Sequence, residues 1–262
     1  MTNIANIMIK DLFKITLGFN IISLIHLCKY GPTLFIEACK RSFTASHTTD
    51  TRILATIPIV TLEKLLHGSK QTITLNISNK EDGAMPYYQA IPFVSLLVKH
   101  NPRIVLEIGT FLGHTTKLIA QNLPEATVHT MDLPPDFLNK EDTVKNLTKD
   151  DFHLIEKRKT DREFLGTDYE KRITQHLGDT ATYDFSKASG ATFFFIDGSH
   201  TYDYCKNDSE KCYELCEGKG VFVWHDCDFA HPGVVQCIKE WRDLGRDIVR
   251  IEGTPLAYLN TL

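Results

Sequence analysis

From residue 86 onward, short apolar runs alternate with longer segments of helical pattern, and this alternation restricts the fold more than any other feature. Strands are predicted at residues 103–108, 127–131, 172–177, 192–196, 221–224, 247–252 and 256–260, with helices at 88–100, 115–122, 202–216 and 233–244. Strands that alternate with helices of this length form βαβ units, which build a mostly parallel sheet covered on both faces. We therefore predict a doubly wound α/β domain over residues 86–262.

Residues 1–85 have a different pattern and are predicted to form a helical and extended cap or an oligomerisation arm. Apolar residues recur there at helical spacing, as expected for a helix buried against the domain or a second copy of the chain. We therefore expect a homo-oligomer. An uncharged run at 15–28 is shorter than the roughly 20 apolar residues that a membrane span needs. The apolar second side of this helix also allows peripheral membrane contact through Ile9, Phe13, Leu17 and Leu24.

The charge composition and the cysteine spacing restrict which partners and which cellular compartment are expected. The chain carries 29 Lys and Arg against 33 Asp and Glu, a net charge of −4, and no stretch is rich in basic residues. Proteins that bind nucleic acids have a basic patch, so no nucleic-acid partner is expected. The seven cysteines are scattered rather than paired in CxxC motifs, which favours reduced thiols and a cytoplasmic location.

One connection, residues 134–171, is unusually long and charged. A loop of this length without secondary structure is uncommon inside a compact domain. Two interpretations remain open for it. In the first, it contains a helix and a lid over the carboxyl edge of the sheet, where open α/β folds bind ligands. In the second, it is an ordinary surface loop.

The strongest local signal is a buried strand that turns on glycine into a helix, from Glu107 through Gly109 and Gly113. These glycines allow the backbone to approach a ligand, and the new helix offers free N–H groups. The dinucleotide fingerprint GxGxxG is not met, because Phe111 occupies one of its glycine positions. Glu107 would also repel a phosphate, so the turn suits a ligand that carries an amine or another positive charge.

Two further acids end the next two predicted strands. Asp132 stands where an α/β nucleotide-binding fold places a carboxylate for the ribose hydroxyls. Asp179 follows Gly178 and is placed to meet the exocyclic amine of an adenine. Each acid alone is common turn chemistry, but three at successive strand ends indicate a nucleoside-binding edge.

With these residues the sequence resembles the class I methyltransferases that use S-adenosylmethionine (SAM), specifically methyltransferase domain family 24. The resemblance rests on Glu107–Thr116, Asp132–Pro135, Gly178–Phe185, Phe195–Tyr202 and Val223–Asp226. It implies a seven-stranded Rossmann-like sheet that binds SAM. Glu107 and the glycines would lie under the methionine part, Asp132 at the ribose and Asp179 near the adenine. The implied cofactor site is Glu107, Gly109, Thr110, Phe111, Gly113, Thr115, Asp132, Asp179, Thr180 and Asp197.

Two neighbouring strand ends bring acids and imidazoles together at the same edge. Asp197 and His200 follow the apolar strand 192–196, and His225 and Asp226 follow 221–224. Oxygen-rich clusters suit Mg²⁺ or Ca²⁺, whereas a set that includes His also suits Mn²⁺ or Zn²⁺. The sequence therefore predicts a polar reaction centre beside the cofactor.

In the metal-dependent catechol-type relatives, two acids bind the metal and a basic residue takes the proton of the acceptor. By position, the resemblance implies Asp197 and Asp226 as ligands of Mg²⁺ or Mn²⁺ and His200 as the base. One departure is Cys227, which occupies the place of an asparagine ligand, so His225 or Asp228 would have to substitute. A further departure is that the base is His rather than Lys. With its ordinary pKa near 6.5, we expect His200 to be mostly neutral at pH 7.

Three functions follow from these patterns. The first is a SAM-dependent O-methyltransferase that acts on a small-molecule, sugar or natural-product hydroxyl, including a glycan acceptor. The second is an NAD-linked oxidoreductase on the same class of fold, which Phe111 and Glu107 disfavour. The third is a SAM-binding protein without catalysis, whose marker would be a broken set of Asp197, His200 and Asp226; that set is intact in the sequence.

Overall fold

The computed structural model describes residues 51–76, 84–134, 137, 149–157 and 161–262, all within one compact unit, Thr49–Leu262. The expected N-terminal helices, and the subunit and membrane contacts predicted for them, lie outside the described residues. The helices are α4 (Thr51–Thr56), α5 (Leu62–Leu66), α6 (Tyr87–His100), α7 (His114–Asn122), α8 (Lys149–Lys157), α9 (Tyr202–Leu215) and α10 (Pro232–Asp243). The strands are β1 (Ile59–Val60), β2 (Ile104–Ile108), β3 (Thr127–Asp132), β4 (Ile173–Leu177), β5 (Phe193–Ile196), β6 (Val221–Trp224), β7 (Val249–Ile251) and β8 (Ala257–Asn260).

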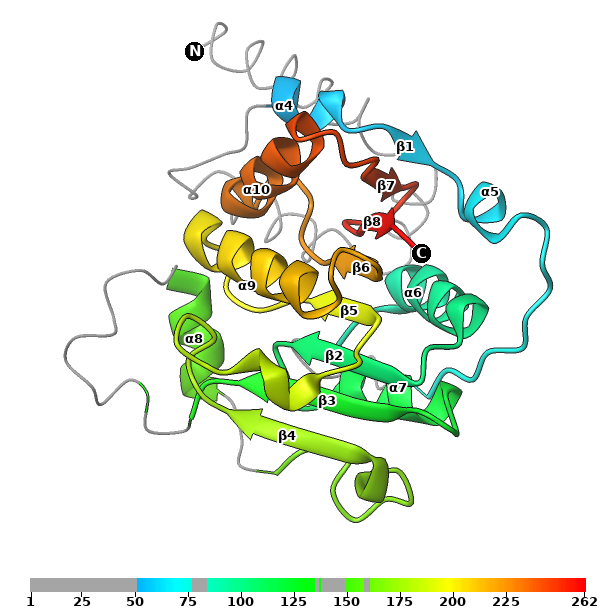
Figure 1. Cartoon of the computed structure of the whole chain (residues 1–262), viewed down its shortest axis with the longest axis vertical. Helices are drawn as coiled ribbons and strands as arrows, with labels where there is room; N and C mark the ends of the chain where they lie inside the picture. The colour runs from blue at the N-terminus through cyan, green and yellow to red at the C-terminus, as the bar shows by residue number, and fades with distance from the viewer. Residues whose placement is uncertain (1–50, 77–83, 135–136, 138–148, 158–160) are drawn as a thin grey trace, which may run out of the picture. The chain divides into compact units, whose positions relative to one another are not determined.

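The strands form one sheet in the order β1-β7-β8-β6-β5-β2-β3-β4 (Figure 1). All neighbours are parallel except β8, which runs antiparallel to both β6 and β7. This mostly parallel, Rossmann-like α/β sheet confirms the predicted fold class. The predicted strand count was seven, and the eighth is β1, where Ile59 and Val60 pair with Arg250 and Ile251 of β7. A strand of two residues is too short to give a periodic signal.

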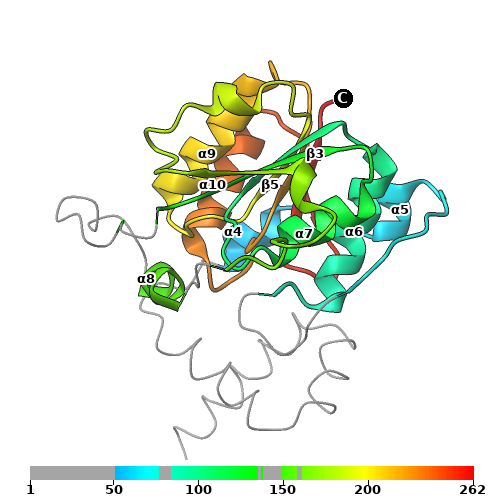
Figure 2. The ribbon, with the colours of Figure 1, turned by 90° about the horizontal axis from the view of Figure 1, so that it is seen from below.

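Helices cover both faces of the sheet, because the central strands are apolar on both sides (Figure 2). In β5, Phe193 and Phe195 belong to the core cluster that includes α6 and α7. Phe194 and Ile196 belong to the cluster that includes α9 and α10. All four side chains are buried. The sheet is therefore rigid at the centre, and the ends of β2, β5 and β6 are fixed relative to one another.

The segment before α6 packs on this domain rather than standing apart from it. Ile57, which follows α4, is 1% exposed and belongs to the core that includes α10. β1 adds to the sheet edge, and Leu62, Leu65 and Leu66 of α5 pack on the other core. The structure thus starts the compact unit near residue 49, whereas the sequence suggested a boundary near residue 85.

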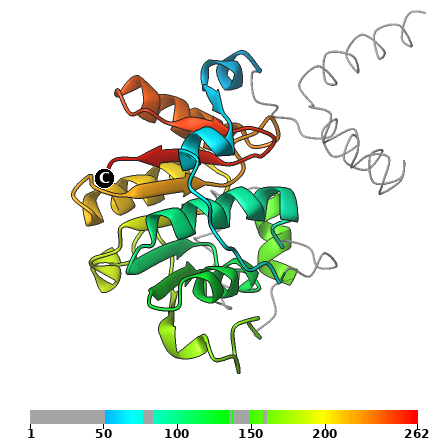
Figure 3. The same ribbon diagram turned by 90° about the vertical axis from the view of Figure 1, so that its right-hand side faces the viewer.

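The long connection contains helix α8, as one of the two interpretations predicted. Asp151 on α8 contacts Ser199 and His200, so the helix lies at the carboxyl end of the parallel strands (Figure 3). Leu154 and Ile155 of the same helix line the pocket described below. Among the residues that the structure describes, no helix is long and apolar enough to cross a membrane.

Candidate active site

The glycine turn after β2 is shaped by the neighbouring strand end. Gly109 has a φ of +100°, and its N–H donates to the Met131 carbonyl at 2.9 Å. A Cβ at this position would lie 2.0 Å from the carbonyl oxygen of Asp197. The sequence explained Gly109 by close approach to a ligand. The structure adds another cause: the glycine makes room for the backbone that follows β5, while it also lines the pocket described next.

Gly113 has a similar explanation. Its φ is +79°, and a Cβ there would lie 2.8 Å from the ring of Phe164 and 3.3 Å from the Cβ of Arg162. The segment that follows the long connection therefore packs directly on the start of α7. The glycine at this position accommodates protein.

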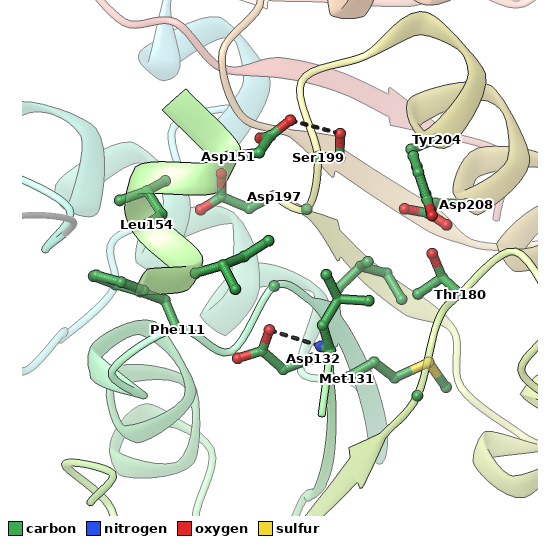
Figure 4. Close-up of a pocket in the computed structure, with 16 residues that line it drawn as sticks. Phe111, Met131, Asp132, Asp151, Leu154, Thr180, Asp197, Ser199, Tyr204 and Asp208 are labelled. Atoms are coloured by element: carbon green, nitrogen blue, oxygen red, sulfur yellow. Dashed lines mark hydrogen bonds between the residues drawn. The ribbon is translucent and has the colours of Figure 1, made fainter. Parts of the chain in front are cut away.

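A pocket opens where β2, β3, β4 and β5 end, and Figure 4 shows the side chains around it. Five of the predicted cofactor residues line it: Gly109, Phe111, Asp132, Thr180 and Asp197. Phe111 has a positive φ of +45°, a conformation that side chains other than glycine rarely adopt. The fold therefore holds an aromatic ring at the pocket wall at the cost of backbone strain.

The other five predicted cofactor residues are not among the residues that line the pocket: Glu107, Thr110, Gly113, Thr115 and Asp179. Glu107 is fully buried beneath the turn, where one carboxylate oxygen accepts hydrogen bonds from Thr116 and, at 2.6 Å, from Thr130. Burial raises the pKa of Glu107 to about 8. Its second carboxylate oxygen, Oε1, is buried without a hydrogen-bond partner among the described residues. A direct contact of these five with the cofactor stays a prediction.

Asp132 ends β3 at the pocket wall. One of its oxygens accepts the Leu133 N–H at 2.8 Å, and the other lies 3.6 Å from the guanidinium of Arg162. The Arg162 side chain is only 4% exposed. The carboxylate predicted for the ribose is therefore oriented from two sides.

The predicted metal ligands Asp197 and Asp226 come together around one imidazole. His225 Nδ1 lies 3.3 Å from Asp197 Oδ1 and 2.9 Å from Asp226 Oδ2. The other nitrogen of His225 contacts Gln89 Oε1 at 2.9 Å. Two carboxylates and an imidazole thus offer ligand atoms within 4.8 Å of one another. This donor set fits a divalent cation such as Mn²⁺.

Cys227 is not part of either group of candidate ligand atoms among the described residues, and the structure explains its presence. The side chain is fully buried, and burial raises the pKa of its thiol to about 12. Its N–H donates to the Pro255 carbonyl at 2.8 Å. The preceding residue, Asp226, has a left-handed φ of +58°. The turn after β6 therefore directs Cys227 into the core, and His225 is the residue that fits the missing ligand position.

His200 is held at both ring nitrogens. Nδ1 lies 2.8 Å from Asp151 Oδ1, and Nε2 lies 2.9 Å from Asp226 Oδ2. Burial alone would lower the pKa of His200, but the hydrogen bonds to both carboxylates hold it well above its ordinary value. The expectation that His200 is mostly neutral at pH 7 is therefore wrong in this arrangement. The prediction overlooked two acidic partners that are far from His200 in the sequence.

A second histidine completes the cluster. The ring of His231 lies 4.6 Å from that of His200, and its Nδ1 contacts Asp228 at 2.9 Å and Asp226 at 3.5 Å. His200, Asp226 and His231 form another set of three candidate ligand atoms. From the sequence, His231 is predicted to start a helix, with a substrate contact as the alternative, and it does stand directly before α10.

Three residues of the site were missed by the sequence interpretation. Asp151 reaches His200 from α8, Gln89 reaches His225 from α6, and Asp208 lines the pocket from α9. No local motif marks them. The periodicity of α9 could have indicated that Asp208 lies on its buried face, beside Cys205 and Cys212.

One comparison with known proteins matches part of the sequence to a family model. Residues 106–227 match the family model described as a methyltransferase domain. No curated protein matches the sequence. Three solved structures are similar: the O-methyltransferase TomG from Streptomyces achromogenes with SAM, the methyltransferase PaMTH1 from Podospora anserina with S-adenosylhomocysteine (SAH), and the O-methyltransferase from Bacillus cereus with SAH.

These likenesses are distant. TomG is 18% identical, with 84% of this chain and 94% of that chain covered and a TM-score of 0.45. PaMTH1 is 11% identical, with 89% and 97% covered and a TM-score of 0.47. The Bacillus cereus enzyme is 13% identical, with 80% and 91% covered and a TM-score of 0.44. Similarity of this degree carries no information on the substrate.

Proposed function

Residues 106–227 belong to the methyltransferase domain family, and from that premise we propose that this protein transfers the methyl group of SAM to the hydroxyl oxygen of a small molecule or glycan. One observation carries the choice of cofactor. The pocket is lined by four carboxylates, those of Asp132, Asp151, Asp197 and Asp208. No Lys or Arg is present among the described residues that line it. Such a lining suits SAM, which carries a sulfonium and an ammonium group.

The same lining argues against the NAD-linked alternative. A dinucleotide brings a pyrophosphate with two negative charges, which these carboxylates would repel. Phe111 also replaces the glycine that lets the backbone approach a pyrophosphate. The Arg162 guanidinium, which lies beside the wall, already faces Asp132 at 3.6 Å. The charge of the pocket and the shape of the turn thus favour the same cofactor.

A divalent metal fits the group of acidic and imidazole side chains after β5 and β6, which we call the reaction cluster. Asp197, His225 and Asp226 would hold it, and a bound metal would lower the pKa of an acceptor hydroxyl. An imidazole among the ligands favours Mn²⁺ over Mg²⁺, because Mg²⁺ prefers oxygen ligands alone. The intact grouping of these residues also supports turnover over a non-catalytic SAM-binding protein.

SAM supplies an activated methyl group, so the protein has to align the acceptor oxygen and accept its proton. His200 was the predicted base, but both of its nitrogens contact carboxylates. We assign proton acceptance to the neighbouring His231. Its Nδ1 contacts Asp228 at 2.9 Å, and its Nε2, which has no hydrogen-bond partner among the described residues, would receive the proton. His200 then positions Asp226.

Calorimetry with the purified full-length chain tests the proposal. SAM and SAH are expected to bind with micromolar dissociation constants, whereas NAD is expected to bind at least about 100-fold more weakly. Incubation with phenol, sugar and polyketide acceptors should then release SAH. Binding of NAD without binding of SAM would overturn the assignment. Binding of SAM without SAH release across a broad acceptor panel would favour the non-catalytic alternative.

A further inference from the structure

A buried carboxylate that no sequence pattern singled out forms part of the pocket wall. Asp208 lies on α9, is 1% exposed and lines the pocket together with Gly178, Thr180 and Tyr204 (Figure 4). A Cβ on Gly198, which also lines the pocket, would lie 3.4 Å from Asp208 Oδ2. The carboxylate therefore stands between the turns that follow β4 and β5.

The surroundings of Asp208 compensate its charge only in part. Asn207 Nδ2 donates to Oδ1 at 2.9 Å, and the Thr180 hydroxyl also hydrogen-bonds to the carboxylate. The Lys211 ammonium donates to the backbone carbonyls of Thr180 and Ala181 at 2.5 and 3.0 Å. Burial raises the pKa of Asp208 to about 6. Two hydrogen bonds and the charge of Lys211 thus compensate the buried carboxylate only in part, and buried carboxylates of this kind are often retained for a ligand.

Asp179, the acid that the sequence assigned to the adenine, is engaged in its own turn. Its Oδ1 accepts the Ala181 N–H at 2.9 Å, and its carboxylate also hydrogen-bonds to Tyr204. Asp179 is not among the residues that line the pocket, whereas the two residues that flank it, Gly178 and Thr180, are. The backbone near Asp179 thus borders the pocket, but its carboxylate serves the turn.

The pocket has two chemically different ends. Phe111, from the turn after β2, and Asp197 lie towards one end, and Thr180 and Tyr204 lie towards the opposite end (Figure 4). Asp132 lies between them at the end of β3. If the ribose of SAM is held at Asp132 and the methyl group faces Asp197, the purine occupies the end formed by Thr180 and Asp208.

We propose that Asp208 recognises the adenine of the cofactor by accepting a hydrogen bond from its exocyclic N6 amine. The inference rests on the proposed function, because it takes SAM as the ligand. A carboxylate only accepts hydrogen bonds when ionised, so it favours an amine at this position and repels a carbonyl oxygen. The purine specificity of the pocket would then come from α9 rather than from the turn after β4.

The experiment compares SAH with S-inosylhomocysteine, in which a carbonyl replaces the N6 amine. Calorimetry on the full-length chain should give a preference for SAH of about 10- to 100-fold, the range of one hydrogen bond to a charged group. In Asp208→Asn the side-chain amide can both donate and accept, so the preference should fall to about threefold or less. The ratio of the two affinities is insensitive to a general distortion of the pocket, because distortion weakens both ligands alike.

Three further variants make the result specific. Glu210→Gln removes an exposed carboxylate two residues away on the same helix and should leave the ratio unchanged. Asp208→Ser repeats the test if the asparagine variant unfolds, although Asn removes a costly buried charge and is expected to fold. Asp179→Asn should retain the ratio.

Two results would overturn the inference while leaving the proposed function intact. One is a wild-type preference below about threefold, and the other is a preference that Asp179→Asn abolishes and Asp208→Asn retains. A wild-type protein that binds neither SAH nor SAM would instead overturn the proposed function. The two failures are therefore distinguishable in one series of titrations.

Discussion

The two ends of the pocket are built by different means. At the cofactor end, the main elements are backbone turns and two carboxylates, those of Asp132, which faces Arg162, and Asp208, which accepts from Asn207. At the reaction end, charged and imidazole side chains contact one another in a continuous network of Asp151, Asp197, His200, His225, Asp226, Asp228 and His231. A change at the first end should alter affinity for the cofactor. A change at the second should alter turnover, because it disturbs several side chains at once.

The largest expected effect is at Asp226, which contacts His200, His225 and His231. Asp226→Asn should lower kcat by about 10³-fold, since it weakens both the candidate metal site and the position of His200. SAM affinity should change less than about threefold. Steady-state kinetics and calorimetry give the two numbers, and the electron paramagnetic resonance of added Mn²⁺ should show a bound signal in the wild type that the variant loses.

Chelation offers a check that requires no substitution. Excess EDTA should lower turnover, and added Mn²⁺ should restore it in the wild type but not in Asp226→Asn. Full turnover in EDTA, together with a folded and active variant, would mean that Asp197 and Asp226 only organise the imidazoles.

The next largest effect distinguishes the role of His231 from that of His200. His231→Ala should lower kcat by about 10²- to 10³-fold, the contribution of a positioned base. His200→Ala should cost less, about tenfold, because His200 acts through Asp226. Both variants should bind SAM as the wild type does. A greater loss in His200→Ala than in His231→Ala would restore His200 as the base.

The sequence predicted the strands, the order of the motifs and the acids at the strand ends, because each depends on neighbouring residues. Gly109 was recognised as a turn, but its cause, the Asp197 carbonyl, is 88 residues away and leaves no local pattern. The charge state of His200 was missed for the same reason, since Asp151 reaches it from the long connection. Periodicity and spacing thus locate a strand end, whereas the partners that set its chemistry depend on tertiary packing.

Glu107 provides a thermodynamic test of the turn after β2, beneath which it is buried. Its pKa of about 8 lies above the ordinary value of 4.5, so between these pH values the folded state binds more protons than the unfolded state. Folding stability should therefore fall as pH rises from 4.5 to 8. Glu107→Gln mimics the neutral carboxyl and should be more stable than the wild type by about 2–3 kcal/mol at pH 7.

The measurement is urea unfolding without cofactor at pH 5, 6.5 and 8. The stability difference between Glu107→Gln and the wild type should be small at pH 5 and grow towards pH 8. Glu163→Gln, at an exposed carboxylate that contacts Lys117, is the matched control and should give a small difference at every pH. A difference for Glu107→Gln that is independent of pH would show that Glu107 is ionised in the folded state throughout this range.

The smallest expected effect is at Asp132, and it tests whether the cofactor end acts on affinity alone. Loss of a hydrogen bond between a carboxylate and a ribose hydroxyl costs about 1.5–3 kcal/mol, so Asp132→Ala should weaken SAM binding by about tenfold or more. Turnover at saturating SAM should stay within about threefold of the wild type. Asp243→Ala, at an exposed site on α10, controls for the lost charge. An unchanged SAM affinity in Asp132→Ala would remove this residue from the site. A large fall in kcat would show instead that releasing Arg162 from Asp132 disturbs the reaction end, so that the two ends are coupled through the segment after α8.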